Sequence, residues 1–502
     1  MSNIAIRHTG AAILALAFSG CMQAGLRVAD APAATGGPRL EVVDKHADQY
    51  QLLGNGRVRI LSRGEFVLDH EDQNHLYIAI YPANAPISAS PLPALEPEHE
   101  SPVRNRTGAI KLVDVGHGLP HAGQWRDNFA VGDLLGDGST QLIFPPARKS
   151  GDLPALFREQ GDQWQRVPLR VPATGYDYGG AAIADVDGDG RNDLVLAAHL
   201  KGFSALHAEA DGHFSLFDAG LPNRQKAEIS GSGVAVLTLP SAAGSKAATV
   251  LLLRESVAGG ASRPLMPGIA AYRYDPAGFI GTPLGENKKM SGNSMAFAAA
   301  TPRCAAKLVI GSSYLGPPPL LESSDAIRWT VRTIDTFPDP AARVGAVTLG
   351  DADGDGCSDL AVAYSRRIGA AWHSMMDVYL DRGDHWLRIN LLDQPRDARV
   401  TAMAFGATPK HPAGELLFAL DNNGTLRAYD ISGGSGEILF ERAAPEWRHG
   451  CAASDVRILP ADTNGALRIA ASFAGEPIMG AFDRCPNGGG IEAWRIDDAN
   501  LK

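Results

Sequence analysis

The chain has 502 residues and a formal net charge of −10, with 45% hydrophobic and 20% charged residues, an ordinary composition for a globular protein. An acidic chain has no overall basic field, which argues against a nucleic acid partner and confines any anion-binding surface to a local patch. The 56 glycines and 33 prolines favour many short strands joined by turns.

The first residues predict an export signal. Residues 11–18 form an apolar run that is too short to cross a bilayer, because a spanning helix needs about 20 apolar residues. The run ends in Phe18-Ser19-Gly20-Cys21, which resembles a bacterial lipobox, where small residues precede a cysteine that is lipidated and becomes the N-terminus. We expect residues 1–20 to be a lipoprotein signal peptide and Cys21 to carry the lipid. Cleavage by the ordinary signal peptidase is the alternative, since Phe18 replaces the usual leucine.

Two segments separate this signal from the rest of the chain. Residues 21–38 are rich in Ala, Pro and Gly and lack bulky apolar side chains, so they predict a flexible tether. Residues 39–108 contain strand-like runs and a proline-rich stretch, which predict a small β extension and a linker. Met22 after the cysteine, in place of Asp, resembles lipoproteins sorted to the outer membrane. We therefore expect an exported outer membrane lipoprotein, periplasmic or surface-facing, that contacts the membrane only through its N-terminal lipid anchor.

One pattern recurs from residue 129 onward. A short apolar strand enters a polar or glycine-rich hairpin tip, and a second strand rich in Leu, Val and Ala leaves it. A repeat of several strands with a period of about 50 residues is typical of a propeller blade. The sequence therefore predicts an all-β fold, a seven-bladed β-propeller over residues 109–502. The seven instances begin at Phe129, Ala182, Val234, Ala296, Ala346, Ala402 and Ala453.

The two ends of the repeat predict how the ring closes. The last unit contains only three strands, the third at residues 490–496, and a matching outer strand stands before the first unit at residues 109–115. We infer that this N-terminal strand completes the last blade, because closure removes sheet edges that would otherwise pair with other chains. An open stack of sheets is the alternative.

Two hairpin tips carry aspartates at a fixed spacing. Residues 185–193 and 351–359 both read D-x-D-x-D-G-x-x-D. Ca²⁺ binds six to eight oxygens, and carboxylates about 4 Å apart repel each other by roughly 1 kcal/mol even in water, so such clusters favour a bound ion. The sequence predicts two structural calcium ions, with backbone carbonyls completing each carboxylate set. The predicted ligands are Asp185, Asp187, Asp189, Arg191, Asp193, Asp351, Asp353, Asp355, Cys357 and Asp359.

These tips are distinct from EF-hand loops. An EF-hand needs a bidentate Glu at its twelfth position, whereas Leu196 and Val362 stand there and fit the second strand of a hairpin. The two loops resemble the calcium loops of FG-GAP or VCBS repeats, which form the blades of integrin α-subunit heads and of many secreted bacterial proteins. This resemblance implies a calcium-binding propeller over about residues 109–496. A third tip, residues 133–141, has Leu135 and Gln141 where acids belong, so we expect weak or no binding there.

The remaining cysteines favour disulfides, because four of them follow an export signal and the exported compartment is oxidising. On the propeller prediction, Cys451 starts the innermost strand of the last blade and Cys485 lies between its second and third strands, on the same face. We predict a Cys451–Cys485 bond. Cys304 and Cys357 lie at corresponding tips of neighbouring blades, where a bond requires Cα atoms within about 7 Å, and this pair is left open.

The face opposite the calcium tips is the candidate ligand surface. The loops that form it gather arginines, which bind carboxylate or phosphate, and aromatic rings, which stack on sugars or peptide side chains. The alternative is that these long side chains only cover apolar surface. The candidates are His121, Trp125, Arg126, Tyr176, Tyr178, Arg343, Trp372, His373, Arg399, Trp447 and Arg448.

Two functions follow from these patterns. The preferred one is a binding or scaffold protein that recognises a protein or an anionic glycan. The alternative is a propeller-type polysaccharide lyase or other carbohydrate-active enzyme, which would need a base such as His121, His373 or Tyr178. The sequence contains no G-x-S-x-G, H-E-x-x-H, phosphate-loop or dinucleotide motif, and we assign no catalytic residue.

Overall fold

The computed structural model describes residues 39–44, 50–52, 57–60, 64–71, 75–80 and 103–501, the last range with gaps at 127, 148–149, 151, 174, 199–200, 223–231, 240–246, 256–267, 286–291, 313–314, 326–327, 369–370, 396–398, 412, 476–484 and 486. The predicted signal peptide, the lipidation site Cys21 and the tether lie outside these residues. In the described part of the chain, no helix is long and apolar enough to cross a membrane.

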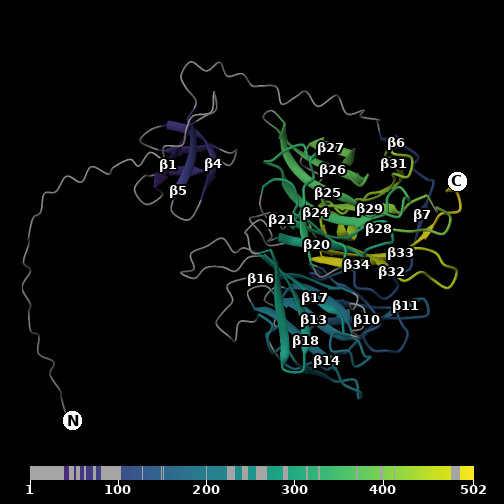
Figure 1. Cartoon of the computed structure of the whole chain (residues 1–502). Coiled ribbons are helices and arrows are strands. Elements are labelled where there is room, and N and C mark those ends of the chain that lie inside the picture. The colour runs from purple at the N-terminus through teal and green to yellow at the C-terminus, as the bar shows by residue number, and fades with distance from the viewer. Residues whose placement is uncertain are drawn as a thin grey trace, which may run out of the picture. The chain divides into compact units, whose positions relative to one another are not determined.

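The chain divides into two compact units, Met1–Leu95 and Glu96–Lys502 (Figure 1). The first unit contains an antiparallel sheet of five strands in the order β1-β5-β4-β3-β2. Its strands are β1 (Arg39–Asp44), β2 (Tyr50–Leu52), β3 (Arg57–Ile60), β4 (Gly64–Glu71) and β5 (His75–Ile80).

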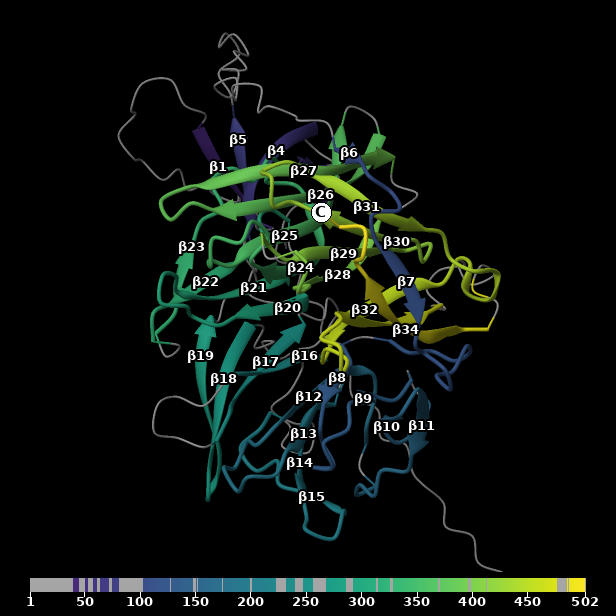
Figure 2. The ribbon, with the colours of Figure 1, turned by 90° about the vertical axis from the view of Figure 1, so that its right-hand side faces the viewer.

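The second unit is a seven-bladed β-propeller, as the repeat predicts. In blades 1 to 6 four antiparallel strands follow one another along the chain, and the first strands of successive blades lie against each other around the centre (Figure 2). Blades 1 to 3 consist of β8 (Ala130–Gly132), β9 (Gln141–Phe144), β10 (Ala155–Gln160) and β11 (Gln163–Val167), then β12 (Gly179–Ala184), β13 (Asp193–Ala198), β14 (Gly202–Ala208) and β15 (Phe214–Leu216), then β16 (Ser232–Leu239), β17 (Thr249–Glu255), β18 (Gly268–Asp275) and β19 (Gly278–Gly285).

The remaining blades continue the same order around the ring. Blades 4 and 5 consist of β20 (Gly292–Ala298), β21 (Ala306–Ser312), β22 (Leu320–Ser323) and β23 (Thr330–Arg332), then β24 (Arg343–Gly350), β25 (Asp359–Ile368), β26 (Ala371–Asp381) and β27 (Trp386–Pro395). Blade 6 consists of β28 (Val400–Gly406), β29 (Leu416–Asp421), β30 (Leu426–Asp430) and β31 (Glu437–Arg442). The 3-10 turn η3 (Glu446–Arg448) leads into blade 7, whose strands are β32 (Ala452–Leu459), β33 (Arg468–Ala474) and β34 (Gly489–Asp497).

An N-terminal strand closes the ring, as predicted. Strand β7 (Lys111–Asp114) pairs antiparallel with β34 and supplies the fourth strand of blade 7. A second strand, β6 (Arg104–Asn105), adds to the outer edge of β31 in parallel, so blade 6 has five strands. These two residues fall in the segment that the sequence predicts to be a linker. An ion pair of 2.8 Å between Arg106 and Glu437 holds this segment against blade 6.

Small residues on the innermost strands let neighbouring blades approach each other. A Cβ atom added to Gly350 of β24 would lie 2.3 Å from the Cβ of Phe405 on β28. One added to Gly406 of β28 would lie 2.8 Å from Ile458 on β32. Larger side chains from the second and third strands fill the space between blades; Phe418, Phe473 and Trp494, for example, are buried in one cluster between blades 6 and 7. The hydrophobic core is therefore a series of layers between blades.

Candidate metal loops and ligand face

The blade 5 tip, between β24 and β25, gathers carboxylates. Carboxylate oxygens of Asp351, Asp353 and Asp355 lie within 4.8 Å of one another. Asp359 begins β25 at the base of the loop, where its oxygens accept hydrogen bonds of 2.8 Å from the backbone N–H groups of Ala352 and Asp381. Burial, with the charges of Asp353 and Asp355, raises the pKa of Asp359 to about 8. Negative charge at this loop is therefore costly unless a cation compensates it.

One feature of this loop fits a bound cation, and a second offsets part of its negative charge from within the chain. Oδ1 of Asp351 is buried and forms no hydrogen bond of normal geometry with the described residues, whereas Oδ2 accepts the N–H of Gly356 at 3.0 Å. A buried oxygen without a partner costs about 1–3 kcal/mol. The guanidinium of Arg382 lies 2.5 Å from Asp353 and 3.4 Å from Asp355 and supplies positive charge at the edge of the cluster.

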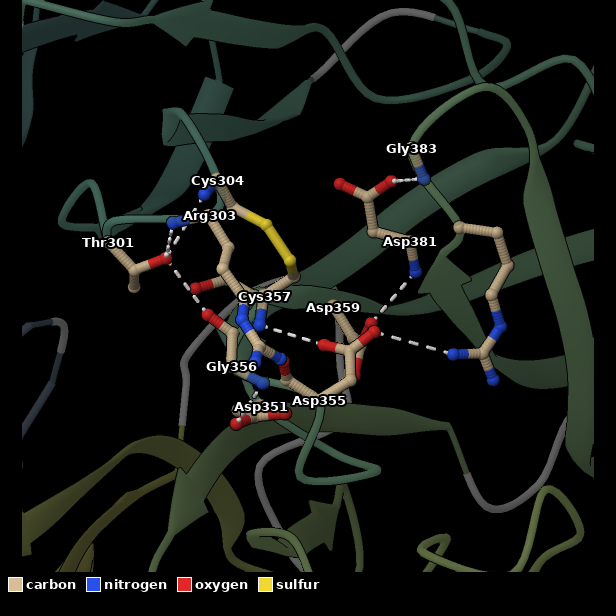
Figure 3. Close-up of a disulfide and its surroundings, with 12 residues drawn as sticks. Thr301, Arg303, Cys304, Asp351, Asp355, Gly356, Cys357, Asp359, Asp381 and Gly383 are labelled. Atoms are coloured by element: carbon tan, nitrogen blue, oxygen red, sulfur yellow. Dashed lines mark hydrogen bonds and ion pairs between the residues drawn. A yellow bond between two sulfur atoms is a disulfide. The ribbon is translucent and has the colours of Figure 1, made fainter.

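Blade 4 holds this loop from the side. A disulfide joins Cys304 to Cys357, whose Cα atoms are 5.5 Å apart, so the bond that the sequence left open is present (Figure 3). Thr301 donates to the carbonyl of Gly356 at 3.0 Å and Arg303 to that of Asp355 at 3.1 Å. Lys307 donates to the carbonyl of Ser358. The carbonyls on both sides of Cys357 thus bond to blade 4, which leaves the Cys357 carbonyl as the predicted backbone ligand of this stretch.

A buried charge cluster, which the sequence motif does not include, supports the base of the blade 5 loop. The N–H of Asp381 donates a hydrogen bond to Asp359. The carboxylate of Asp381 forms an ion pair of 2.5 Å with Lys307 and accepts two hydrogen bonds, of 2.8 and 2.9 Å, from Arg332. Burial alone would raise the pKa of Asp381, but the hydrogen bonds from Arg332 and Lys307 lower it to about 2. The three charged residues come from blades 4 and 5, so no local sequence pattern reveals them.

The blade 2 tip, between β12 and β13, repeats the acidic arrangement with an additional residue. Oxygens of Asp185, Asp187 and Asp189 lie within 4.8 Å of one another, and Asp187 also forms such a group with Asp193 and His207. Asp193 is buried at the base of the loop, and burial raises its pKa to about 6. His207 lies on β14, a strand that the sequence motif does not include.

The blade 1 tip contains side-chain donors in place of carboxylates. The amide of Gln141 donates to Asp133 at 3.2 Å and to Asp137 at 3.1 Å, and Arg158 donates to Asp137 at 3.2 Å. These hydrogen bonds from within the chain offset the negative charge of the two aspartates.

The opposite face contains the predicted ligand candidates, because the loops that lead into each blade and those that join second to third strands lie at the other end of the strands from the metal tips. We call this surface the ligand face. The exposed ring of His121 stacks on Trp447 with centroids 4.3 Å apart and planes 10° apart. The exposed Arg343 lies over the half-buried ring of Trp372, 5.4 Å from its centroid. Arg399 is exposed, and His373 contacts Asp393 at 2.6 Å.

The other ligand candidates have structural contacts. Arg448 is buried, with 0% exposure, and its Nε donates to Glu492 at 2.6 Å, so its assignment to the ligand surface is wrong. Tyr176 and Tyr178 are also buried, and Arg126 covers the ring of Tyr178 at 4.6 Å. Trp125 packs edge-to-face on Phe144 and Phe157 and is half-buried.

The second disulfide lies at this face. Cys451 at the start of blade 7 bonds to Cys485, with Cα atoms 4.6 Å apart. The pairing predicted from up-and-down topology is confirmed.

Comparison with known proteins assigns neither a family nor a function to this chain. No protein-family model and no curated protein matches this chain. Among solved structures, BBS1N in a crystal of its complex with ARL6DN aligns over 78% of this chain and 98% of its own, with 11% identity and a TM-score of 0.44. The BP39L lectin from Burkholderia pseudomallei aligns over 70% of this chain and 96% of its own, with 13% identity and a TM-score of 0.46. At these values the ligands of those proteins do not transfer to this chain.

Proposed function

We propose that the protein is an exported binding protein that recognises an anionic glycan or a protein through the ligand face, while calcium stabilises its opposite face. The observation that carries this proposal is the stacking of exposed imidazole and guanidinium groups on half-buried indole rings, on one face of a chain whose net charge is −10. The pairs are His121 with Trp447 and Arg343 with Trp372. Arginine binds a carboxylate through two hydrogen bonds, and a flat ring stacks on a sugar.

The position of Trp447 favours binding. Its ring packs on Gly490, where an added Cβ would lie 2.5 Å from the ring, so the indole is held in place before a ligand arrives. A rigid aromatic side chain loses little entropy on binding. The candidate bases of the lyase alternative, His121, His373 and Tyr178, belong to three different blades, and Tyr178 is buried. Binding therefore remains the preferred function.

The ligand face is tested by alanine substitution. Trp447→Ala or Arg343→Ala should each weaken binding to polygalacturonate at least tenfold, because interface residues that anchor a ligand contribute about 1.4 kcal/mol or more. Titration calorimetry measures the affinity. Arg104→Ala is the matched control, since Arg104 is 73% exposed on blade 6 outside the ligand face, and it should leave the affinity within twofold. Equal losses in all three variants would contradict the proposal, and absorbance from an unsaturated product would establish the lyase instead.

The calcium proposal is supported by the chemistry of the two loops. Asp351, Asp353 and Asp355 converge and offer only oxygen ligands, and the orphaned oxygen of Asp351 is one that an ion would bind. Asp359 and the Cys357 carbonyl are the further ligands that we propose for this site. Asp185, Asp187, Asp189, Asp193 and the Arg191 carbonyl form the second set. A bound ion would neutralise each cluster and stabilise the tips.

Removal of calcium should lower the melting temperature. Extracellular modules bind calcium with Kd values of about 10⁻⁴–10⁻³ M, so millimolar calcium adds about 1 kcal/mol per site, or roughly 1–2 °C in a protein of this size. EGTA should remove this increment in calorimetric scans, and Asp353→Asn should remove half of it. Asp384→Asn is the control, since Asp384 is 89% exposed beside the same blade. An unchanged melting temperature together with no bound metal would reject both sites.

Export and lipidation complete the proposal. Two disulfides suit an oxidising compartment, in agreement with the signal-like start of the sequence. We propose that Cys21 is lipidated and that the protein is held at the outer membrane. Mass spectrometry of the N-terminal peptide from membrane-extracted protein tests this, because an unmodified peptide that begins after Cys21 would exclude the anchor.

A further inference from the structure

The side chain of His207 points into the acidic cluster of the blade 2 loop. Its Nδ1 lies 3.0 Å from Oδ2 of Asp187 and 3.3 Å from Oδ1 of Asp193. Neither contact has hydrogen-bond geometry, so this buried nitrogen has no hydrogen-bond partner in the described part of the chain. The ring is positioned edge-to-face against Phe217, with centroids 5.7 Å apart. One nitrogen and two carboxylate oxygens therefore converge at the base of this loop.

The blade 5 loop differs at the corresponding position. Asp193 Oδ1 accepts the N–H of Ala208, and Asp359 Oδ1 accepts the N–H of Asp381, so these two pairs are equivalent. The residue before each donor is then His207 in blade 2 and Leu380 in blade 5. Leu380 is fully buried between blades 5 and 6. The two loops thus share their aspartate motif, but only in blade 2 does this position add a nitrogen that can bind a metal ion.

We propose that the blade 2 loop is a mixed nitrogen–oxygen site that binds a first-row transition metal ion such as Zn²⁺ in preference to Ca²⁺, through Asp187, Asp193 and Nδ1 of His207. The blade 5 loop remains an oxygen-only calcium site. This inference rests on the proposed metal-binding role of the loops and adds the metal preference of one of them.

The spacing and the donor types support a transition metal. Two atoms bound at about 2.1 Å to one ion are about 3.0 Å apart in octahedral and about 3.4 Å apart in tetrahedral geometry. The distances from Nδ1 to the two carboxylates, 3.0 and 3.3 Å, fall in this range. Imidazole nitrogen is a ligand that Zn²⁺ prefers, whereas Ca²⁺ takes oxygen.

The surroundings hold the ligands in place. Asp193 accepts backbone N–H groups of Val186 and Ala208 at 3.1 Å on its two oxygens, which fixes the carboxylate. The distal nitrogen of His207 lies 3.8 Å from a carboxylate oxygen of Asp189 and 3.4 Å from Arg191. A carboxylate beside the outer nitrogen, as Asp189 is here, can accept the N–H that a histidine keeps on that nitrogen when its inner nitrogen binds a metal.

The test is metal titration of the full mature protein in an Asp353→Asn background, which removes the blade 5 site. Zn²⁺ alone and Ca²⁺ alone are titrated by calorimetry, and Co²⁺ is added as a spectroscopic probe of nitrogen ligation. His207→Leu copies the blade 5 residue, and His207→Asn is a second variant that keeps polarity. His213→Leu is the control, since His213 is an exposed histidine of the same blade. Melting curves without metal confirm that each variant folds.

We expect one Zn²⁺ per chain, an affinity at least tenfold lower in both His207 variants, and a change in the Co²⁺ absorption bands, with the control unchanged. Calcium affinity should change less than threefold. Zn²⁺ binding that does not depend on His207, or equal losses for both ions, would overturn the inference while leaving the calcium proposal intact. Binding of neither ion in this background would reject the blade 2 loop as a metal site altogether.

Discussion

Substitution of Arg448 by alanine should lower the free energy of unfolding by about 3–5 kcal/mol, because removal of one partner of a buried ion pair leaves the other charge uncompensated. Arg448 bonds to Glu492 of β34 at 2.6 Å, donates to the carbonyl of Gly424, and lies 4.2 Å above the ring of Phe473. It therefore connects blades 6 and 7. Burial raises the pKa of Glu492 above its usual value, so the carboxylate relies on this partner.

A double-mutant cycle separates the ion pair from simple packing. Arg448→Met and Glu492→Leu should each destabilise the protein in thermal and denaturant unfolding, and the double variant should recover a large part of the loss because no buried charge remains. Additive losses would show that the two side chains contribute independently, which would contradict this account.

Removal of residues 1–115 should open the ring. Strand β7 pairs with β34 over four residue pairs, and Ile110 beside it is buried in the cluster between blades 6 and 7. Loss of these hydrogen bonds and of the buried side chain should cost on the order of 5 kcal/mol. It would also expose the edge of β34, which invites pairing between chains.

Size-exclusion chromatography and thermal unfolding measure this effect. A truncated chain that begins at residue 96 keeps β6 and β7 and serves as the control, which should remain monomeric with an unchanged melting temperature. If the chain that begins at residue 116 were equally stable and monomeric, β7 would have no role in closure.

The propeller could be predicted because its strand pattern repeats at a regular spacing along the sequence. The recurring strand–tip–strand unit specified seven blades, and the missing outer strand of the last unit matched the segment that became β7. The metal tips were also visible, since all their carboxylates lie within nine consecutive residues. Cys451 and Cys485 could be paired because up-and-down topology alone places them on one face.

The contacts between strands could not be predicted in the same way. His207 reaches the blade 2 loop only through the register of β13 against β14, in which Leu194 pairs with Leu206. Trp125-Arg126 and Trp447-Arg448 look equivalent in sequence, yet Trp447 stacks with an exposed histidine and Arg448 is buried against Glu492. The difference depends on residues far away in the chain, which no local pattern contains.

The covalent joint between blade 4 and the blade 5 loop has a consequence for the kinetics of ion exchange. Because Cys304–Cys357 and three hydrogen bonds fix one side of that loop, its ligands are already arranged before an ion arrives. An ion bound there should dissociate slowly, since release cannot be assisted by opening of the loop. The blade 2 loop has no cysteine, so two sites with one motif are expected to exchange their ions at different rates.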